Sequence, residues 1–260
     1  MQAFAYSNPA SVADAARAGA VDGAKYIAGG QTLLSSMKLG LAAPEALVDL
    51  GAIAELKGIT VSGGTVKIGA MTTHAAVAAH ADVQKAIPAL AQLAGNIGDR
   101  QVRNRGTIGG SLANNDPAAC YPAAVLGLGA TVHTNTRSIA ADDFFTGMFS
   151  TALAEGEVIT AVSFPIPEKA GWQKFKQPAS RFSIVGVFVS KGPQGVRVAV
   201  TGAGSGVFRA SGLEAKLAAN WSAAALNGAT VSADGLNSDL HGSAEYRAAL
   251  IPVLAGRAVA

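Results

Sequence analysis

The chain has 260 residues and a formal net charge of +3. Hydrophobic residues make up 50% of it and charged residues 14%, a balance that excludes an intrinsically disordered protein. A chain of this length forms one or two domains with a sizeable core. Its single cysteine, Cys120, excludes a disulfide framework and a Cys-ligated cluster or zinc site built by this chain alone. The four histidines show no metal-ligand spacing, so we predict no metal site.

The sequence also bears on secretion, membrane insertion and nucleic-acid binding. The first twenty residues lack a basic segment followed by an apolar core, so we predict no secretory signal and a cytoplasmic location. The longest uncharged stretch, 118–136, contains Pro122 and polar residues, so we predict no membrane span. No run of Lys or Arg alternates with aromatic residues, which speaks against nucleic-acid binding.

The first part of the chain alternates between helix and strand patterns. Two glycines at 63–64 predict a tight hairpin turn. Thr72 or Thr73 is expected to cap a helix, and the glycine-rich segment 96–115 is expected to be a long loop. The predicted elements in chain order are a helix at 9–19, a strand at 25–28, a helix at 32–39, a strand at 46–50, a hairpin at 58–70, broken helix at 72–94, a helix at 122–128 and a strand at 131–134.

From residue 157 onwards the pattern changes to strands joined by short turns, followed by two helices. The fold class is therefore α+β, with an α/β part up to about residue 170 and an antiparallel sheet with helices after it. The elements expected in this part are strands at 158–164, 171–176, 182–190 and 197–201 and helices at 209–219 and 243–256.

A glycine pair lies in Ala28-Gly29-Gly30-Gln31-Thr32, between a predicted strand and a helix start. Glycines permit positive φ and close approach of the backbone to a ligand. Free N–H groups at such a turn attract an anion, most often a pyrophosphate. A tight strand–helix turn without a ligand explains the same residues equally well.

A second glycine pair lies in Thr107-Ile108-Gly109-Gly110-Ser111, where Thr107 and Ser111 offer hydroxyls to phosphate or ribityl oxygens. The alternative is an unusual surface turn. Neither segment has the Rossmann spacing, so a dinucleotide site here is of another type. A Cβ at Gly30 or Gly110 is expected to fill ligand space and to be incompatible with positive φ. We interpret a third run, 202–206, as a structural turn.

Four segments together resemble a known family: AGGQTLLSSMKLGLAAPEALVDL (28–50), IGAMTTHA (68–75), QVRNRGTIGGSLANNDPAACYPAAVLGLGA (101–130) and FKQPASRFSIVGV (175–187). They resemble the FAD-binding medium subunits of the molybdenum hydroxylases, which include carbon monoxide dehydrogenase, xanthine dehydrogenase and aldehyde oxidase. The resemblance extends from about Phe4 to about Val253.

The resemblance implies a two-part FAD-binding domain of the vanillyl-alcohol-oxidase type at 1–170, divided near 55–60, and a C-terminal domain of sheet and helices at 171–260. It implies that the first glycine segment holds the FAD diphosphate and that the second passes beside the diphosphate and the flavin. The implied FAD-binding residues are Ala28, Gly29, Gly30, Gln31, Thr32, Leu33, Thr107, Ile108, Gly109, Gly110, Ser111, Ile159, Lys176 and Phe182.

One departure concerns Cys120, because many relatives have a carboxylate there that contacts FAD. Cys120 is expected to line the pocket as a small apolar group. Asp116 is the nearest acid, and it either touches FAD or caps a helix that starts at Pro117. His74 lies near the expected flavin edge, although a surface histidine at a helix start is the alternative that we favour.

The resemblance also implies an oxidoreductase subunit without catalytic residues of its own, since the flavin supplies the reactivity. A small partner with two [2Fe–2S] clusters and a large partner with the molybdenum cofactor are expected, as a dimer of heterotrimers. Electrons would pass through FAD to an external acceptor. Two alternatives stay open: a stand-alone FAD oxidoreductase with its own substrate pocket, and an assembly subunit that has lost FAD.

Overall fold

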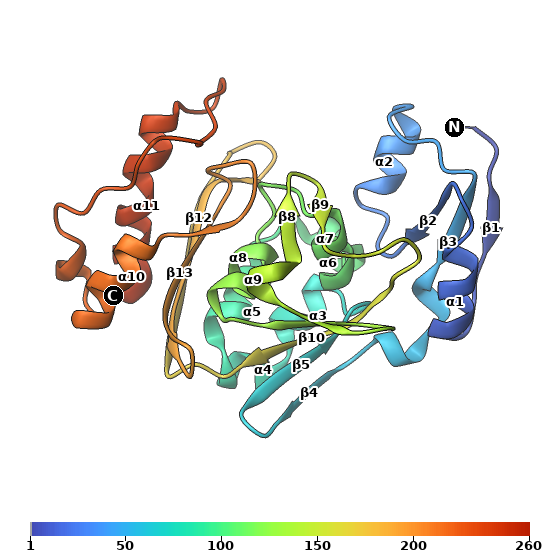
Figure 1. Cartoon of the computed structure of the whole chain (residues 1–260), viewed down its shortest axis with the longest axis horizontal. Coiled ribbons are helices and arrows are strands. Elements are labelled where there is room, and N and C mark those ends of the chain that lie inside the picture. Colours follow the sequence, from blue (N-terminus) through green and yellow to red (C-terminus); the bar gives the residue numbers. More distant parts are fainter. Residues whose placement is uncertain (1) are drawn as a thin grey trace.

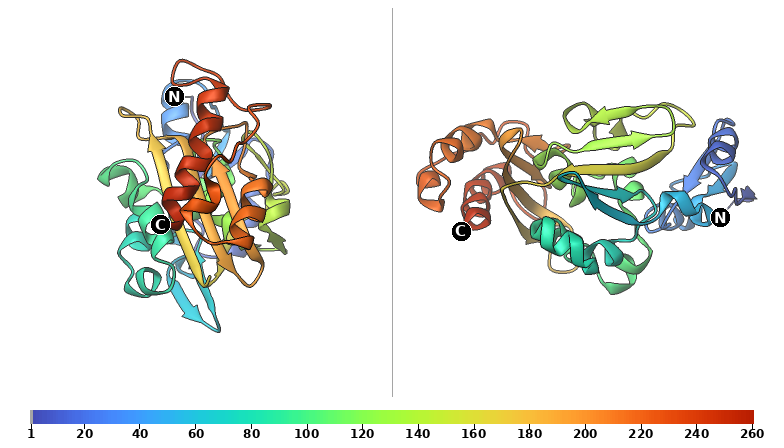
Figure 2. Two further views of the ribbon diagram at one scale, coloured as in Figure 1. Left: turned by 90° about the vertical axis from the view of Figure 1, so that its left-hand side faces the viewer. Right: turned by 90° about the horizontal axis from the view of Figure 1, so that it is seen from below.

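The computed structural model describes residues 2–260 and contains three sheets arranged in a row, together with one small hairpin (Figures 1 and 2). The first sheet is parallel, whereas the second and the third are antiparallel. The first two sheets are joined by a small apolar cluster in which Val48, Leu50 and Leu56 pack with Met71 and Val158.

The N-terminal unit is a parallel sheet with the strand order β1-β3-β2. Parallel neighbours need crossover connections, and two short helices provide them. Ser11 caps the first of these helices, because its side chain accepts a hydrogen bond from the N–H of Asp14. The elements are β1 (Ala5–Ser7), α1 (Val12–Gly19), β2 (Ala24–Ile27), α2 (Leu33–Lys38) and β3 (Ala46–Asp49).

The central sheet has the strand order β4-β5-β10-β6-β7, with every neighbouring pair antiparallel. Gly63 and Gly64 both have positive φ, which confirms the predicted two-glycine hairpin turn. The strands are β4 (Ile59–Ser62), β5 (Thr65–Gly69), β6 (Thr131–Thr134), β7 (Ser138–Ala140) and β10 (Ile159–Pro165).

Helices inserted between β5 and β6 pack against this sheet and enclose the largest apolar cluster. Thr73, rather than Thr72, caps the first of them by accepting a hydrogen bond from the N–H of Ala76. The helices are α3 (His74–Ala79), α4 (Ala81–Ala86), α5 (Pro88–Gly95), α6 (Arg100–Arg105), α7 (Ile108–Asn114) and α8 (Tyr121–Gly127). A small excursion follows β7, formed by α9 (Ala141–Phe144), β8 (Phe145–Gly147) and β9 (Ser150–Thr151).

The C-terminal sheet lies between two layers of helices. Phe188 packs with the central cluster, while Val185 and Val187 pack with the cluster formed by the last helices, so β12 is buried on both faces. This explains its nearly continuous apolar sequence. The elements are β11 (Lys169–Lys176), β12 (Ser183–Gly192), β13 (Gly195–Thr201), β14 (Phe208–Arg209), α10 (Ser211–Ala219) and α11 (Ala244–Val259).

The prediction of a long loop at 96–115 is wrong, because α6 and α7 occupy most of it. Asp99 caps α6 through Val102 N (2.8 Å), and Thr107 caps α7 through Gly110 N (3.2 Å). The glycines of α7 serve packing, since a Cβ on Gly109 would lie 2.6 Å from the Cβ of Ala70. Glycine here permits close approach between a helix and β5 and does not indicate irregular backbone.

The predicted strand at 158–164 exists as β10, but it pairs with β5 and β6 in the central sheet and not with the strands that follow it. The central sheet ends at residue 165 and the C-terminal sheet begins at 169. The division into a two-part FAD-binding domain at 1–170 and a C-terminal domain at 171–260 remains our proposal.

Among residues 2–260, no helix is both long enough and apolar enough to cross a membrane. The same residues contain no group of three or more His, Cys, Asp and Glu side chains that could hold a metal ion.

Candidate functional site

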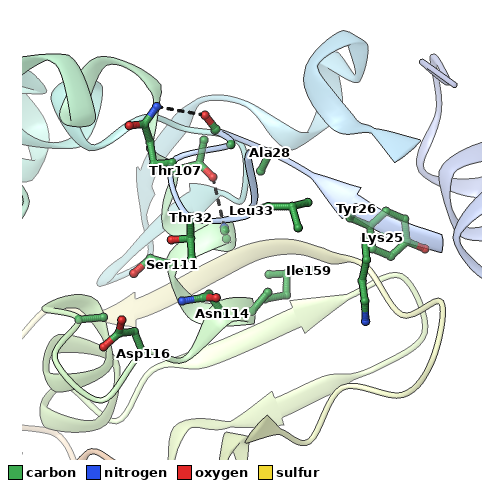
Figure 3. Close-up of a pocket in the computed structure, with 18 of the residues that line it drawn as sticks. Lys25, Tyr26, Ala28, Thr32, Leu33, Thr107, Ser111, Asn114, Asp116 and Ile159 are labelled. Carbon is green, nitrogen blue, oxygen red and sulfur yellow. Dashed lines mark hydrogen bonds between the residues drawn. The ribbon is translucent and has the colours of Figure 1, made fainter. Parts of the chain in front are cut away.

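A cavity of about 1060 Å³ lies between the N-terminal unit and the central sheet, and it extends to the C-terminal sheet at β11. Figure 3 shows Thr32, Thr107, Ser111 and Asn114 around one space, with Asp116 towards one end and Lys25 with Tyr26 towards the other. Residues from all three sheets and from α7 therefore share one elongated site.

The first glycine segment follows β2 and leads into α2. The N–H groups of four consecutive residues, Gly30, Gln31, Thr32 and Leu33, donate to no acceptor among residues 2–260. All four residues line the cavity. The side chain of Thr32 forms no capping bond, so its hydroxyl is also available. Adjacent free amides at the start of a helix form a binding site for an anion.

Glycine is required at both positions of this pair. Gly30 has φ of +70°, which favours glycine. At Gly29 a Cβ would lie 2.2 Å from the carbonyl oxygen of Arg105, which precedes Gly106 and Thr107. The first glycine segment therefore touches the chain that leads into the second, and the two segments lie side by side.

The second glycine segment is the first turn of α7 and not a loop. Its amides are already used: Ile108 N donates to Thr72 O (3.2 Å), Gly109 N to Ala70 O (2.8 Å) and Gly110 N to Thr107 Oγ1 (3.2 Å). Gly110 also lacks the positive φ that we expected. This segment therefore offers side chains to a ligand, while the free amides belong to the first segment.

The lining atoms of α7 are mainly polar side chains. Thr107 and Ser111 line the cavity, together with Asn114 one turn further along the helix. Ile108 does not line it, because its side chain is fully buried in the central core. Ile159, the first residue of β10, lines the cavity.

The far end of the cavity is formed by the segment before α8, by β11 and by the segment before β12. Cys120 lies there, 96% buried, and its Sγ is 3.7 Å from Ser183 Oγ. Lys174 Nζ donates to Cys120 Sγ (3.3 Å) and to Asn96 O (3.1 Å). Phe182 also lines this end and is half exposed. It follows Arg181, whose φ of +63° is unusual for a residue other than glycine.

Lys174, not Lys176, lines the cavity. The ladder between β11 and β12 changes register between Phe175 and Lys176. A register change of this kind ends the regular alternation of side chains along a strand. The side chain of Lys176 therefore does not continue the alternation that places Trp172 and Lys174 on one face of β11. The sequence alone does not reveal this irregularity.

Asp116 lines the cavity, but it does not cap a helix starting at Pro117. Its Oδ1 accepts a hydrogen bond from Ala118 N (2.8 Å) within a separate turn. Helix α8 starts four residues later than this interpretation required, at Tyr121, with Cys120 before it. One carboxylate oxygen of Asp116 is thus used in the turn, and the second has no side-chain or backbone donor among residues 2–260.

His74 is not at the surface, contrary to the alternative that we favoured. It is 96% buried, lines the cavity and packs against the Tyr121 ring at 5.3 Å between centroids. Burial, with a smaller contribution from the Arg103 charge, lowers the pKa of His74 to about 4, so its ring is neutral at pH 7. Its Nδ1 is buried without a hydrogen-bond partner among residues 2–260. The spacing to buried Val77, three residues along α3, could have indicated this burial.

Glu157 is a lining residue that the sequence did not reveal. Its buried carboxylate accepts bonds from Arg137 Nε (2.9 Å) and Nη2 (2.9 Å), Ala154 N (2.7 Å) and the hydroxyls of Thr134 (2.6 Å) and Thr136 (3.0 Å). These bonds, above all those from Arg137, lower the pKa of Glu157 to about 2. All its acceptor capacity is used, so the role of Glu157 is to hold residues 134–137 and Ala154 together at the edge of the cavity.

The structure thus brings most of the predicted residues to one cavity and leaves out Ile108 and Lys176. The predicted residues that line it are Ala28, Gly29, Gly30, Gln31, Thr32, Leu33, Thr107, Gly109, Gly110, Ser111, Asp116, Cys120, Ile159 and Phe182. The lining residues that sequence reasoning missed include Lys25, Tyr26, Asn114, Glu157 and Lys174.

Residues 2–167 match the family model described as the FAD binding domain in molybdopterin dehydrogenase. The chain belongs to the FAD-binding medium subunits of the molybdenum hydroxylase family. The matched region includes both glycine segments and the central sheet, and it ends where the C-terminal sheet begins. Members of this family are oxidoreductase subunits, so the predicted enzyme class is confirmed.

Two relatives resemble nearly the whole chain. The nicotine 6-hydroxylase medium subunit of Paenarthrobacter nicotinovorans is 35% identical over 100% of this chain and 97% of its own length. The carbon monoxide dehydrogenase medium chain of Hydrogenophaga pseudoflava is also 35% identical, over 98% of this chain and 96% of its own.

Solved structures agree with this family and with the predicted fold class. A chain of Hydrogenophaga pseudoflava carbon monoxide dehydrogenase lacking the Mo-pyranopterin moiety has a TM-score of 0.88 and 34% identity, covering 99% of this chain and 96% of that one. A chain of quinoline 2-oxidoreductase from Pseudomonas putida 86 has the same TM-score at 32% identity, with coverage of 99% and 96%.

The residues present fit FAD. The diphosphate oxygens are acceptors, and the four free amides of Gly30–Leu33 are donors that lack acceptors of their own. The cavity has the volume of a site for a large ligand. The neutral ring of His74 adds a buried polar atom that the protein leaves without a partner. FAD, when bound here, supplies redox chemistry that the side chains do not have.

Proposed function

We propose that this chain is the electron-transfer subunit of a heterotrimeric molybdenum hydroxylase. In this proposal a small partner carries two [2Fe–2S] clusters, a large partner carries the molybdenum cofactor, and two heterotrimers form a dimer. Electrons from the clusters pass through FAD on this chain to an external acceptor. The observation that carries the proposal is the quartet of free amides that faces an elongated cavity in a chain of this family.

The residues of the chain bind and orient the cofactor. The amides of Gly30–Leu33 would hold the diphosphate, and Thr107 and Ser111 would add hydroxyl contacts from α7. Asn114 lies one turn along the same helix and offers both a donor and an acceptor. Because Thr107 also caps α7, its hydroxyl fixes the helix against which the cofactor would lie.

Two buried titratable side chains at the cavity, His74 and Glu157, are not suited to acid–base chemistry. His74 is neutral at pH 7 and buried, and Glu157 is ionised with every acceptor site occupied. A general base needs a pKa near the working pH, and neither residue has one. This supports a subunit that carries electrons over one with its own substrate chemistry.

Co-expression of this chain with the genes that adjoin its own tests the proposal. The expected result is one FAD per chain, visible as flavin absorbance, in a complex that also contains iron, sulfide and molybdenum. The mass of that complex should correspond to two copies of each subunit.

Two results would replace this proposal with one of the open alternatives. A chain that binds FAD but purifies alone, and that oxidises a small molecule without partners, would be a stand-alone enzyme. A chain that enters the complex without flavin would be an assembly subunit.

A further inference from the structure

Lys174 is a cation in the cavity wall without a carboxylate partner. Its ammonium donates to a carbonyl, Asn96 O at 3.1 Å, and to a thiol, Cys120 Sγ at 3.3 Å. No carboxylate oxygen of residues 2–260 lies within 4.0 Å of it. In contrast, Arg197 and Arg247 are each paired with an aspartate.

The groups that surround Lys174 do not neutralise it. Cys120 and Ser183 lie in contact with each other beside it, and Arg181 lines the same end of the cavity. Arg181 and Arg103 donate to the carbonyl of Gly98, which follows Asn96 by two residues, so the cluster holds further positive charge. A partly buried charge without a counter-ion is stabilised when an anionic group enters the adjacent cavity.

Asp99 and Asp116, the acids closest in the chain to Asn96 and Cys120, form no ion pair with Lys174. Asp99 caps α6 through Val102 N at 2.8 Å, and Asp116 accepts from Ala118 N at 2.8 Å. His74 carries no charge at pH 7. Lys174 and Arg181 contribute two positive charges to this end of the cavity, where Asp116 contributes one negative charge and forms no ion pair with Lys174.

We propose that Lys174 stabilises the negative charge of reduced flavin, and that Cys120 leaves the lysine charge available because the thiol is small and forms no ion pair with it. The inference rests on the proposed function. Flavin that takes up two electrons from the iron–sulfur partner and one proton from solvent keeps one negative charge. A positive charge in the wall favours that state over oxidised, neutral flavin, and thereby raises the midpoint potential.

Two substitutions and one control distinguish an effect of the Lys174 charge on the FAD midpoint potential from an effect of side-chain shape. Lys174→Gln removes the cation while keeping a polar chain. Cys120→Asp places a carboxylate against Nζ and neutralises the cation, whereas Cys120→Asn is nearly the same size and uncharged. The assembled complex, or the FAD-loaded chain, is equilibrated with a dye of known potential, and the midpoint potential of FAD is read from the spectrum.

In Lys174→Gln and Cys120→Asp the equilibrium between reduced and oxidised flavin should move at least about tenfold towards oxidised. For a two-electron couple this is a fall of about 30 mV. In Cys120→Asn the change should stay below about twofold, or about 9 mV on the same scale. Flavin content and melting temperature of each variant establish that the potential is compared between folded, loaded proteins.

An unchanged potential in fully loaded Lys174→Gln would overturn the inference. So would equal shifts in Cys120→Asp and Cys120→Asn, since that result assigns the effect to shape. If Lys174→Gln does not fold, the comparison of the two Cys120 variants still decides the question. Failure of the unsubstituted chain to hold FAD is a separate result, and it contradicts the proposed function instead.

Discussion

The glycine segment after β2 and the side-chain wall, formed by Cys120 before α8 and Lys174 on β11, line the same cavity but are made of different groups. The first consists of residues that line the cavity and whose backbone N–H groups, those of Gly30–Leu33, donate to no acceptor among residues 2–260. The second presents the side chains of Cys120 and Lys174. A backbone site depends on where glycines permit the chain to turn. A side-chain site depends on strand register and on contacts between distant segments, such as the bond from Lys174 to Asn96.

The largest effect is expected from breaking the backbone site with Gly29→Ala. The new Cβ would lie 2.2 Å from Arg105 O, so the two glycine segments must separate. Overpacking of this kind costs about 1–3 kcal/mol. This corresponds to about a 5- to 150-fold loss of FAD affinity if the amides of Gly30–Leu33 are displaced. Titration of flavin-free protein with FAD measures it.

The matched control is Gly206→Ala in the third glycine run, where a Cβ meets nothing within 4 Å and φ is not positive. Its affinity should equal that of the unsubstituted chain. If Gly29→Ala also binds FAD as tightly as the unsubstituted chain does, the first glycine segment does not hold the cofactor.

The next largest effect is expected in the pH dependence of stability, through His74 on α3. Its pKa is about 4 in the folded chain and about 6.5 when unfolded, so below pH 6.5 the unfolded chain binds the additional proton. Stability should therefore fall as pH drops from 6.5 to 4. From these values the loss between pH 7.5 and 5 is about 2 kcal/mol.

Urea unfolding of the unsubstituted chain and of His74→Gln at both pH values measures this loss, which the variant should lack. His133, whose pKa is also lowered by burial, titrates in the same direction in both proteins and cancels in the comparison. An identical pH dependence in the two proteins would mean that the His74 ring is not held neutral.

A smaller effect is expected from Thr107→Ala, which removes the cap of α7. Loss of the bond between Gly110 N and Thr107 Oγ1 should lower the free energy of unfolding by about 1 kcal/mol, as measured by urea denaturation. Thr107→Ser keeps the oxygen and should retain most of that stability. If the serine variant is as unstable as the alanine variant, the methyl group matters and the cap does not.

The smallest effect is expected from Lys176→Gln. Because the register change removes Lys176 from the face of β11 that carries Lys174, FAD affinity and midpoint potential should change by less than about twofold, which corresponds to about 0.4 kcal/mol. The same measurements on Lys174→Gln provide the comparison. A larger effect at Lys176 than at Lys174 would reverse the assignment of the two lysines.

The contrast between the backbone site and the side-chain wall also explains which parts of the site the sequence could predict. Glycines flanked by strand and helix patterns indicated both segments that meet at the cavity, and alternation of apolar residues indicated most strands. The glycines at 109 and 110 predict a loop but lie in a helix, because glycine permits close helix packing as well as irregular turns. Local sequence does not distinguish these two uses.

The side-chain wall was less predictable for a physical reason. Lys174 and Cys120 are 54 residues apart, and their contact exists only because the fold brings β11 to the residue that precedes α8. The choice between Lys174 and Lys176 depends on one irregularity in the ladder with β12. The burial of His74 depends on Tyr121 and the Gly106 backbone, which approach it from other parts of the chain.

The central claim is that the free amides of Gly30–Leu33 hold the diphosphate of FAD. Titration of flavin-free protein with FAD and with FMN, which has a single phosphate and no adenosine, tests it most directly. We predict one FAD per chain, bound at least about a hundredfold more tightly than FMN, since two charge-assisted hydrogen bonds contribute about 3 kcal/mol or more. Equal affinity for the two flavins would contradict the claim.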